Sequence, residues 1–104
     1  MAYHALEKLI HLHDGYRRVF RAGGLSLLLI QEDGRRWLLR DRCPHKDFPL
    51  HTGSLRGTRL RCAYHALEFD LEQGGRCVQF PRQHCLEMFP LVYAGNEVGV
   101  ELPD

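Results

Sequence analysis

The sequence predicts an all-β domain built from short antiparallel strands. Three observations support this fold class. Apolar segments such as residues 25–32 are short and end at turn dipeptides, of which Asp33-Gly34 and Gly74-Gly75 are the clearest. Residues 97–102 alternate between polar and apolar side chains, as a half-buried strand does. No long stretch has the apolar spacing of an amphipathic helix, so we expect a sandwich or a barrel.

Four strands are expected in the first half of the chain, separated by glycine-containing turns. They are placed at residues 3–12, 16–21, 25–32 and 35–41. The first segment also fits a short helical turn over residues 5–12. Residues 25–32 form an almost wholly apolar run between turns, which predicts a strand buried on both faces. Asp33-Gly34 favours a two-residue hairpin that leads the chain through residues 35–41 to Cys43.

The second half is expected to begin with a long loop and to continue as short extended segments. Residues 43–57 contain prolines and glycines, which predicts a loop with at most one helical turn. The segments that follow are residues 58–61, 66–71, 76–80, 86–94 and 97–102. Phe69 is expected to point inward, and Pro90 should interrupt the segment that contains it.

Size and composition indicate one folded domain over residues 1–104. The chain is 44% hydrophobic and 26% charged, and its formal net charge is +1 from 14 Lys and Arg against 13 Asp and Glu. We therefore expect neither nucleic acid nor a membrane as a partner. The longest apolar run is too short to span a bilayer and the N-terminus lacks a secretion signal, so a cytoplasmic location is expected. Thiols stay reduced there, which favours metal binding over disulfides for the four cysteines.

Two short motifs contain the residues best suited to chemistry. Cys43-Pro44-His45 offers one thiol and one imidazole, and Cys62-Ala63-Tyr64-His65 offers the same pair with one more residue between them. Thiolate and imidazole are ligands of zinc, copper and iron–sulfur clusters. A thiol and an imidazole in each of the two loops suit a centre with two unlike metal atoms, one held by sulfur and one by nitrogen.

These motifs resemble those of the Rieske family, in which two histidines replace two cysteines on one iron of a [2Fe–2S] cluster. The resemblance spans about residues 35–102. Its specific positions are Cys43-Pro44-His45-Lys46, Leu50, Gly53, Cys62, His65, Phe69, Asp70, Gly74 and Pro81. It implies one [2Fe–2S] cluster per chain, held by Cys43, His45, Cys62 and His65. It also implies the Rieske fold, an antiparallel β-sandwich or barrel base with a small cluster-binding subdomain at about residues 42–81.

By the same resemblance, four further residues surround the ligands. They are Lys46, Tyr64, Ala66 and Pro81. Pro81 resembles the start of a proline loop that covers the cluster. Lys46, next to His45, would belong to the tip where partners dock, unless it is a simple solvated loop charge.

The chain departs from the respiratory-complex members of that family in both loops. Those proteins join the loops by a disulfide, whereas the matching positions here are Phe48 and Tyr64, so the bridge cannot form. Ala66 and Leu67 stand where the respiratory type has glycine and a hydroxyl donor. Fewer hydrogen bonds to sulfur destabilise the reduced state, which predicts a potential of roughly −150 mV, the low end of the Rieske range. Ala66 would also be strained if its position requires a positive φ.

The resemblance implies a one-electron carrier that takes electrons from a flavin-dependent reductase and passes them to a terminal oxygenase. No second catalytic constellation is apparent, and 104 residues leave no room for the mononuclear-iron domain of such oxygenases, so the chain is not expected to be an enzyme. Three alternatives stay open. The first is a small Rieske-type subunit of a larger oxidoreductase such as nitrite reductase. The second is a zinc-stabilised binding module, and the third is a redox sensor.

A structural zinc site is the plain alternative for the four ligands. Zinc sites usually pair like residues at closer spacing, so the interleaved order favours the iron–sulfur cluster. Cys77 and Cys85 are expected to be core or hairpin thiols, because a four-cysteine cluster would leave both matched histidines unused.

Other notable side chains receive no firm role from the sequence. They are His11, His13, His51, His84, Arg56, Arg59 and Arg61. His11 and His13 alternate on one expected strand face and could bind a metal ion, although exposed surface histidines are the simpler interpretation. The three arginines are expected to be a solvated strand face, with the steering of a partner as the alternative.

Overall fold

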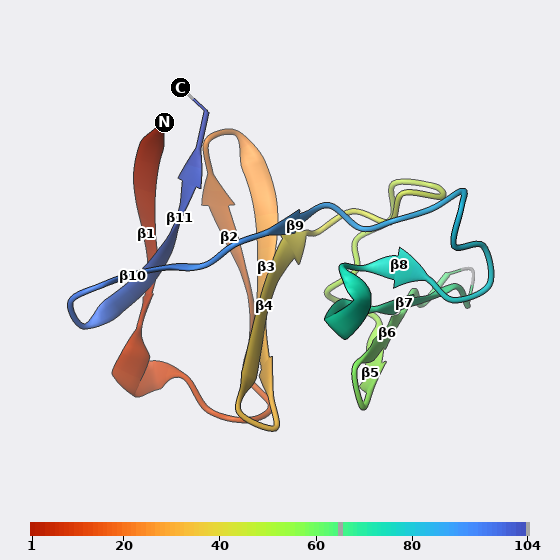
Figure 1. Cartoon of the computed structure of the whole chain (residues 1–104), viewed down its shortest axis with the longest axis horizontal. Helices are drawn as coiled ribbons and strands as arrows, with labels where there is room; N and C mark the ends of the chain where they lie inside the picture. The colour runs from red at the N-terminus through yellow and green to blue at the C-terminus, as the bar shows by residue number, and fades with distance from the viewer. Residues whose placement is uncertain (65, 104) are drawn as a thin grey trace.

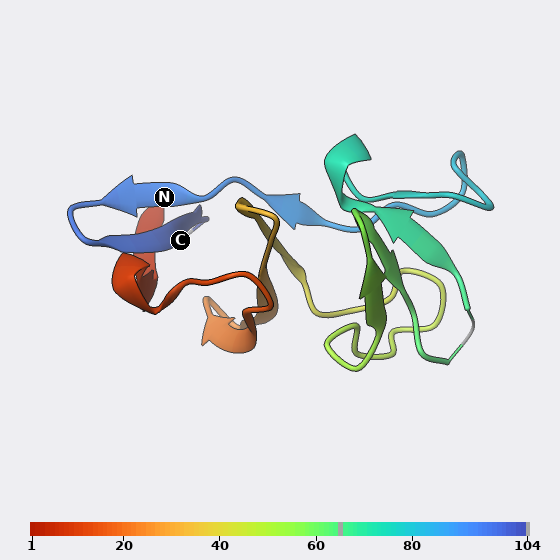
Figure 2. The ribbon, with the colours of Figure 1, turned by 90° about the horizontal axis from the view of Figure 1, so that it is seen from below.

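The computed structural model describes residues 1–64 and 66–103, whose strands form three antiparallel sheets (Figure 1). The molecule is elongated, with extents of 39 × 31 × 20 Å. The two chain termini lie close together in one half of the molecule, and the loops around residues 43–53, 62–64 and 66–67 lie in the other half (Figures 1 and 2). The all-β fold class is confirmed.

Two of the sheets form the base of the molecule. The first has the order β1 (Ala2–Lys8), β11 (Glu97–Leu102) and β10 (Val92–Ala94). The second has the order β2 (Arg17–Ala22), β3 (Leu25–Glu32), β4 (Arg35–Arg40) and β9 (Met88–Phe89). The two ends of the chain are paired in the first sheet, because Ala2 lies opposite Leu102.

The third sheet stands on the far side of the second sheet from the first (Figure 1). Its order is β5 (Ser54–Arg56), β6 (Arg59–Arg61), β7 (Glu68–Asp70) and β8 (Arg76–Cys77). Two short 3₁₀ turns complete the described elements, η1 (Leu9–His11) and η2 (Leu71–Gln73). No helix within residues 1–64 and 66–103 is long and apolar enough to cross a membrane.

Strand β3 is buried on both faces, as its apolar sequence predicts. Leu28 and Ile30 point into one hydrophobic core, and Leu27 and Leu29 point into another. All four side chains are at most 1% exposed. The second sheet is therefore a wall shared by two cores.

The two cores divide the molecule into a base and a loop-bearing half. The base core contains Tyr16, Ala22, Leu27, Leu29, Leu38, Val98, Val100 and Leu102. The loop core contains Leu28, Ile30, Trp37, Leu39, Cys43, Leu50, Leu60, Cys62, Leu67, Phe69, Leu71, Cys77 and Leu86. Phe69 is fully buried, as expected. Because the loop core includes Cys43 and Cys62, the packing of the third sheet positions both of them.

Three expectations about strands are wrong in detail. The segment 3–12 is a strand only to Lys8 and then forms η1, so the strand and the helical turn are both present. Residues 43–57 are not all loop, because β5 pairs with β6 across a turn in which Gly57 has a φ of 61°. The three residues of β5 carry no local strand signal, and their conformation comes from this pairing. The segment 76–80 is a strand only at Arg76–Cys77.

A buried carboxylate network ties β1 to the start of β2. Glu7 is 8% exposed, and its carboxylate accepts hydrogen bonds from the Tyr16 hydroxyl at 2.6 Å and from the Lys8 backbone N–H at 2.9 Å. His11 Nδ1 lies 2.9 Å from the same carboxylate and Arg18 lies 3.3 Å from it. The hydrogen bonds from Tyr16, His11 and the Lys8 N–H, with that from Tyr16 the strongest influence, lower the pKa of Glu7 from 4.5 to about 2. Burial, followed by the Glu7 carboxylate, raises the pKa of Tyr16 to about 12.

The Glu7 network should make the fold sensitive to acid. Because the folded-state pKa of Glu7 lies below its ordinary value, its ionisation stabilises the fold fully above pH 4.5, and this contribution disappears as the pH falls toward 2. Glu7→Gln should therefore melt below the wild type near neutral pH, and the gap should shrink on acidification. Thermal midpoints measured across this range test the point. Glu101→Gln, at an exposed position of the same sheet, is the control and should show no pH-dependent gap.

Candidate metal centre

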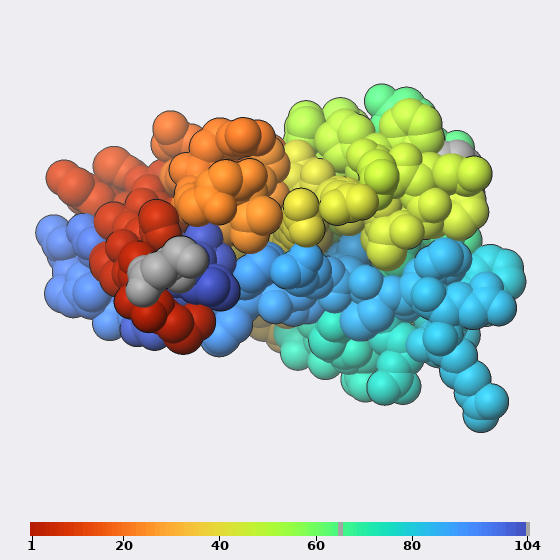
Figure 3. Space-filling view, turned by 90° about the horizontal axis from the view of Figure 1, so that it is seen from above, coloured from red at the N-terminus to blue at the C-terminus, as the bar shows by residue number. Residues whose placement is uncertain are grey.

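Both candidate ligand loops lie in the half of the molecule away from the chain termini (Figures 1 and 2). The first loop follows β4 and covers residues 41–53, and the second joins β6 to β7 through residues 62–67. A third loop, residues 78–87, returns from β8 to β9 and lies beside the first loop in the space-filling view (Figure 3). Three loops that are separate in the sequence therefore meet at this end.

The first loop is closed by two backbone hydrogen bonds at Cys43. The Cys43 N–H donates to the Phe48 carbonyl oxygen at 2.8 Å, and the Asp47 N–H donates to the Cys43 carbonyl oxygen at 2.7 Å. Asp47 has a φ of 63°, a left-handed conformation that aspartate adopts more readily than most residues. The Arg42 guanidinium pairs with the Asp47 carboxylate and holds the pKa of that carboxyl below its usual range.

The second loop repeats this backbone arrangement at Cys62. The Cys62 N–H donates to the Leu67 carbonyl oxygen at 2.8 Å, and the Ala66 N–H donates to the Cys62 carbonyl oxygen at 3.1 Å. Ala66 has a φ of 58°. Each cysteine thus begins the same turn, with the left-handed residue four positions later. The sequence conceals this equivalence because Asp47 and Ala66 share no chemistry, but the strain foreseen for a positive φ at Ala66 is present.

The two thiols lie beside each other inside the loop core. Cys43 is 0% exposed and Cys62 is 1% exposed. Burial raises the pKa of the Cys43 thiol and the adjacent Cys62 thiol also raises it, whereas the backbone N–H groups of His45 and Lys46 lower this pKa. Two adjacent thiolates in apolar surroundings are unfavourable unless a cationic centre binds them. The donor set and its burial therefore fit a thiolate-bound metal.

The imidazole of the first motif lies at the surface, and that of the second motif, His65, lies outside the described residues. His45 is exposed, and its ring meets that of His84 edge to face with 5.3 Å between centroids. His84 belongs to the third loop, where its carbonyl oxygen accepts the Cys77 N–H at 3.0 Å. Sequence reasoning gave His84 no role, because only the folded chain brings it to His45.

An aromatic stack joins the two ligand loops. The rings of Phe48 and Tyr64 are nearly parallel, at 17°, with centroids 4.2 Å apart. Both are exposed, Phe48 at 36% and Tyr64 at 55%. These are the two positions at which the respiratory proteins are expected to carry a disulfide. A non-covalent contact therefore connects the loops where no covalent one is possible.

The first loop is shaped by a buried carboxylate that the sequence did not single out. Asp41 Oδ1 accepts the backbone N–H groups of Leu50 and His51, both at 2.7 Å, and Asp41 Oδ2 lies 2.6 Å from His51 Nδ1. The Asp41 side chain is only 4% exposed. Gly53 ends the loop, and a Cβ there would lie 2.1 Å from the Arg61 carbonyl oxygen, so no larger residue fits.

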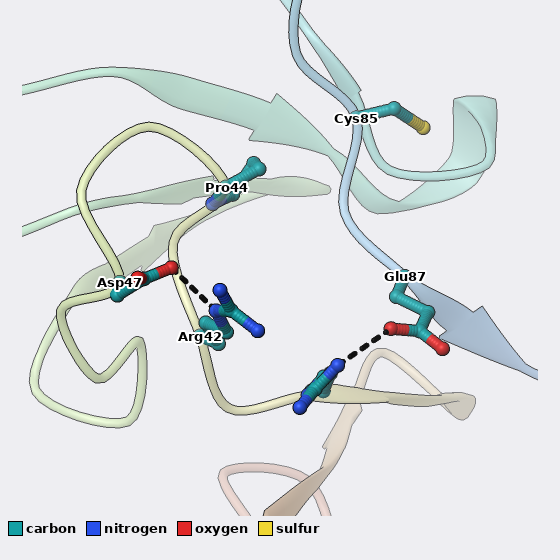
Figure 4. Close-up of a pocket in the computed structure, with 6 residues that line it drawn as sticks. Arg42, Pro44, Asp47, Cys85 and Glu87 are labelled. Atoms are coloured by element: carbon teal, nitrogen blue, oxygen red, sulfur yellow. Dashed lines mark hydrogen bonds and ion pairs between the residues drawn. The ribbon is translucent and has the colours of Figure 1, made fainter.

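A pocket beside the first loop contains charged side chains that pair with one another (Figure 4). It is lined by Arg40, Arg42, Pro44, Asp47, Cys85 and Glu87. Arg42 pairs with Asp47, and Arg40 lies 3.3 Å from Glu87. Cys85 is an exposed thiol that donates to the Gly74 carbonyl oxygen at 3.4 Å, whereas Cys77 is buried in the loop core.

The structure brings some of the expected neighbours to the thiols and leaves others at the surface. The backbone N–H of Lys46 lies at the Cys43 sulfur, while its side chain is exposed. Tyr64 stacks on Phe48, and Ala66 supplies the left-handed turn residue. Pro81 is exposed in the third loop.

Comparison with known proteins gives a consistent picture. A family model described as Rieske [2Fe-2S] domain matches residues 3–90. The iron-sulfur subunit of the toluene-4-sulfonate monooxygenase system of Comamonas testosteroni is 34% identical over 84 residues, covering 75% of this chain and 24% of that protein. The ferredoxin component of the p-cumate 2,3-dioxygenase system of Pseudomonas putida is 29% identical over 86 residues, covering 82% of this chain and 72% of that protein.

A solved structure has the same fold along almost the whole chain. The Sphingomonas yanoikuyae B1 ferredoxin superposes with a TM-score of 0.82 over 98% of this chain and 100% of its own, at 22% identity. The expected fold, an antiparallel base with a smaller sheet beside the ligand loops, is confirmed. The chain spans about a quarter of the length of the monooxygenase subunit, but nearly three quarters of the p-cumate ferredoxin component.

Ala66→Gly should stabilise the protein. Glycine adopts a positive φ without the steric penalty that alanine has, which is worth about 1 kcal/mol, or about 4–8 °C in the thermal midpoint of a domain of this size. Asp47→Gly is the matched control in the equivalent turn. It should give no gain, because aspartate tolerates this conformation and the change removes the partner of Arg42. A lower midpoint for Ala66→Gly would show that the turn is not strained.

The stack of Phe48 on Tyr64 should contribute to metal retention. A double-mutant cycle with Phe48→Leu and Tyr64→Leu should give a coupling free energy of about 0.5–1.5 kcal/mol in thermal stability. Both single variants should also lose iron faster to a chelator, because the loops are no longer joined. Tyr93→Leu, an exposed aromatic of β10 in the base, is the control and should retain iron like the wild type. Additive effects of the two substitutions would contradict this role.

Proposed function

Because the chain belongs to the Rieske [2Fe–2S] domain family, we propose that it carries single electrons between redox proteins by means of one [2Fe–2S] cluster. The proposed ligands are the thiolates of Cys43 and Cys62 and the imidazoles of His45 and His65. When bound, such a cluster supplies reversible one-electron transfer. The observation that carries the proposal is the pair of adjacent buried thiols at the start of two equivalent turns.

The chain's own residues would stabilise the ligands and give them unequal access to solvent. The backbone N–H groups of His45 and Lys46 stabilise the Cys43 thiolate, and the loop core excludes water from both sulfurs. His45 lies at the surface, so a partner that docks on this end of the molecule approaches an imidazole ligand. This asymmetry suits a carrier, because both sulfurs are shielded from water while an imidazole ligand lies at the surface.

We also propose a potential near the low end of the Rieske range, roughly −150 mV. After Cys62 the side chains of Ala63, Ala66 and Leu67 offer no hydrogen-bond donor. With fewer donors to sulfur, the more negative reduced state is less stabilised, and the potential falls.

The proposed partners are a flavin-dependent reductase as donor and a terminal oxygenase as acceptor. Support comes from the two relatives described above, one a ferredoxin component of a dioxygenase system and the other an iron-sulfur subunit of a monooxygenase system. The chain itself would then transfer electrons and leave the chemistry on the organic substrate to the oxygenase. A cytoplasmic location fits this role, because thiols stay reduced there and are available to a metal, and all four cysteines are free thiols.

Metal and sulfide analysis of matched cysteine variants tests the proposal. The purified chain should contain iron and labile sulfide in equal amounts, two of each per chain as the cluster formula requires, and should give an EPR signal when reduced. Cys43→Ser should lose both, because it removes a buried ligand. Cys85→Ser is the control, because the same substitution at an exposed thiol should change neither quantity.

A pair of histidine variants completes the test. His45→Ala should lose the cluster, while His84→Ala, which removes the ring that contacts His45, should retain it. A colourless chain that binds one zinc ion would contradict the proposal, as would full cluster content in Cys43→Ser.

A further inference from the structure

The outward face of the third sheet is rich in arginine. Cross-strand pairing places Arg56, Arg59, Asp70 and Arg76 in one row, and Ser54, Arg61 and Glu68 in a second row beside it. Arg56, Arg59, Arg61 and Arg76, called here the arginine face, are all exposed. The opposite side of the same strands is apolar and packs in the loop core or against it.

These guanidinium groups form no ion pair within the described part of the chain. The ion pairs found there use other arginines, namely Arg18, Arg35, Arg40 and Arg42. The two carboxylates on the same face bond to neutral donors. Asp70 accepts from the Thr58 hydroxyl at 2.9 Å, and Glu68 accepts from the Gln79 amide at 3.3 Å. Four arginines against two carboxylates leave the face positive.

The arginine face continues into the second ligand loop. A surface hollow lined by Ser54, Arg56, Arg59, Arg61 and Glu68 adjoins a second one lined by Thr52, Ser54, Arg61, Cys62, Ala63 and Ala66. The two hollows share Ser54 and Arg61, and Arg61 directly precedes Cys62 in the sequence. The positive surface thus extends from the tip of the β5–β6 hairpin to the loop that contains Cys62.

The pocket beside the first ligand loop differs, because its charges are balanced. Arg40 and Arg42 are paired with Glu87 and Asp47 (Figure 4). The electrostatic attraction of a negatively charged partner is therefore stronger at the arginine face than at this pocket.

We propose that the arginine face is a docking surface for a redox partner whose own surface is acidic, and that it directs this partner to the second ligand loop. The inference rests on the electron-carrier function proposed above and adds the charge of the partner. Two observations support it. The arginines on this side of the centre are not paired with carboxylates, and their positive surface continues to the loop that contains Cys62.

The size of the face favours a protein over a small anion. Neighbouring strands lie about 4.8 Å apart, so four strands spread the arginines over roughly 14 Å on an open surface. A phosphate-sized anion would require guanidinium groups that converge on one point. The overall net charge is only +1, so the attraction is local and should be screened over about 8–10 Å at moderate ionic strength.

Electron transfer to two forms of one haem protein tests the proposal. The chain is reduced with dithionite and separated from the excess reductant. It is then mixed with native cytochrome c, which is rich in lysine, or with succinylated cytochrome c, in which the lysines have become carboxylates. Each reduced chain passes one electron to one ferric haem, which becomes ferrous. Arg56→Gln/Arg59→Gln should slow the reduction of the succinylated form about three- to tenfold at low ionic strength and flatten its salt dependence. Reduction of native cytochrome c should not slow.

A charge-matched variant serves as the control. Lys8→Gln/Arg21→Gln removes the same charge from exposed positions of the two base sheets and should leave both rates near the wild-type values. Equal slowing by the two double variants, or no slowing by Arg56→Gln/Arg59→Gln, would overturn the docking surface while leaving the carrier function intact. Failure of the wild-type chain to reduce either cytochrome would overturn the carrier function, and the docking surface with it.

Discussion

The burial of two thiols side by side is the constraint on which the rest of the structure depends. Cys43 and Cys62 lie almost without solvent contact in the loop core, where a negative charge on sulfur is unfavourable unless a cation binds it. The fold meets this constraint with two turns of the same backbone form. Each turn begins at one thiol and is closed by backbone hydrogen bonds, so each sulfur is positioned by hydrogen-bonded backbone.

The surroundings of the thiols differ between the two loops. The first loop has a buried carboxylate, Asp41, that holds its far end, and ion-paired charges beside it. The second has the left-handed Ala66, no side-chain donor at that position, and the positive sheet face next to it. The two turns therefore position the thiols in the same way. The surroundings differ, because the charges beside the first loop are paired and the surface beside the second loop is positive.

Sequence reasoning succeeded where the signal is local and failed where it depends on pairing in space. The apolar run 25–32 and the alternation over 97–102 predicted β3 and β11 with their observed bounds, and the two motifs led to the family. Strand β5 was missed, because three residues between glycines become a strand only through β6. The stack of Phe48 on Tyr64 was missed for the same reason, since residues in different loops meet only after folding.

The second sheet lies between the two cores, so neighbouring residues of strand β3 pack in different cores. Leu27 and Leu29 pack with the base, while Leu28 and Ile30 pack with the half that contains the thiols. The side chains of the base core are therefore separated from the proposed metal ligands by the thickness of a single sheet. A substitution at Leu28 or Ile30 therefore acts first on the loop core, and one at Leu27 or Leu29 acts first on the base core, although the residues are neighbours in one strand.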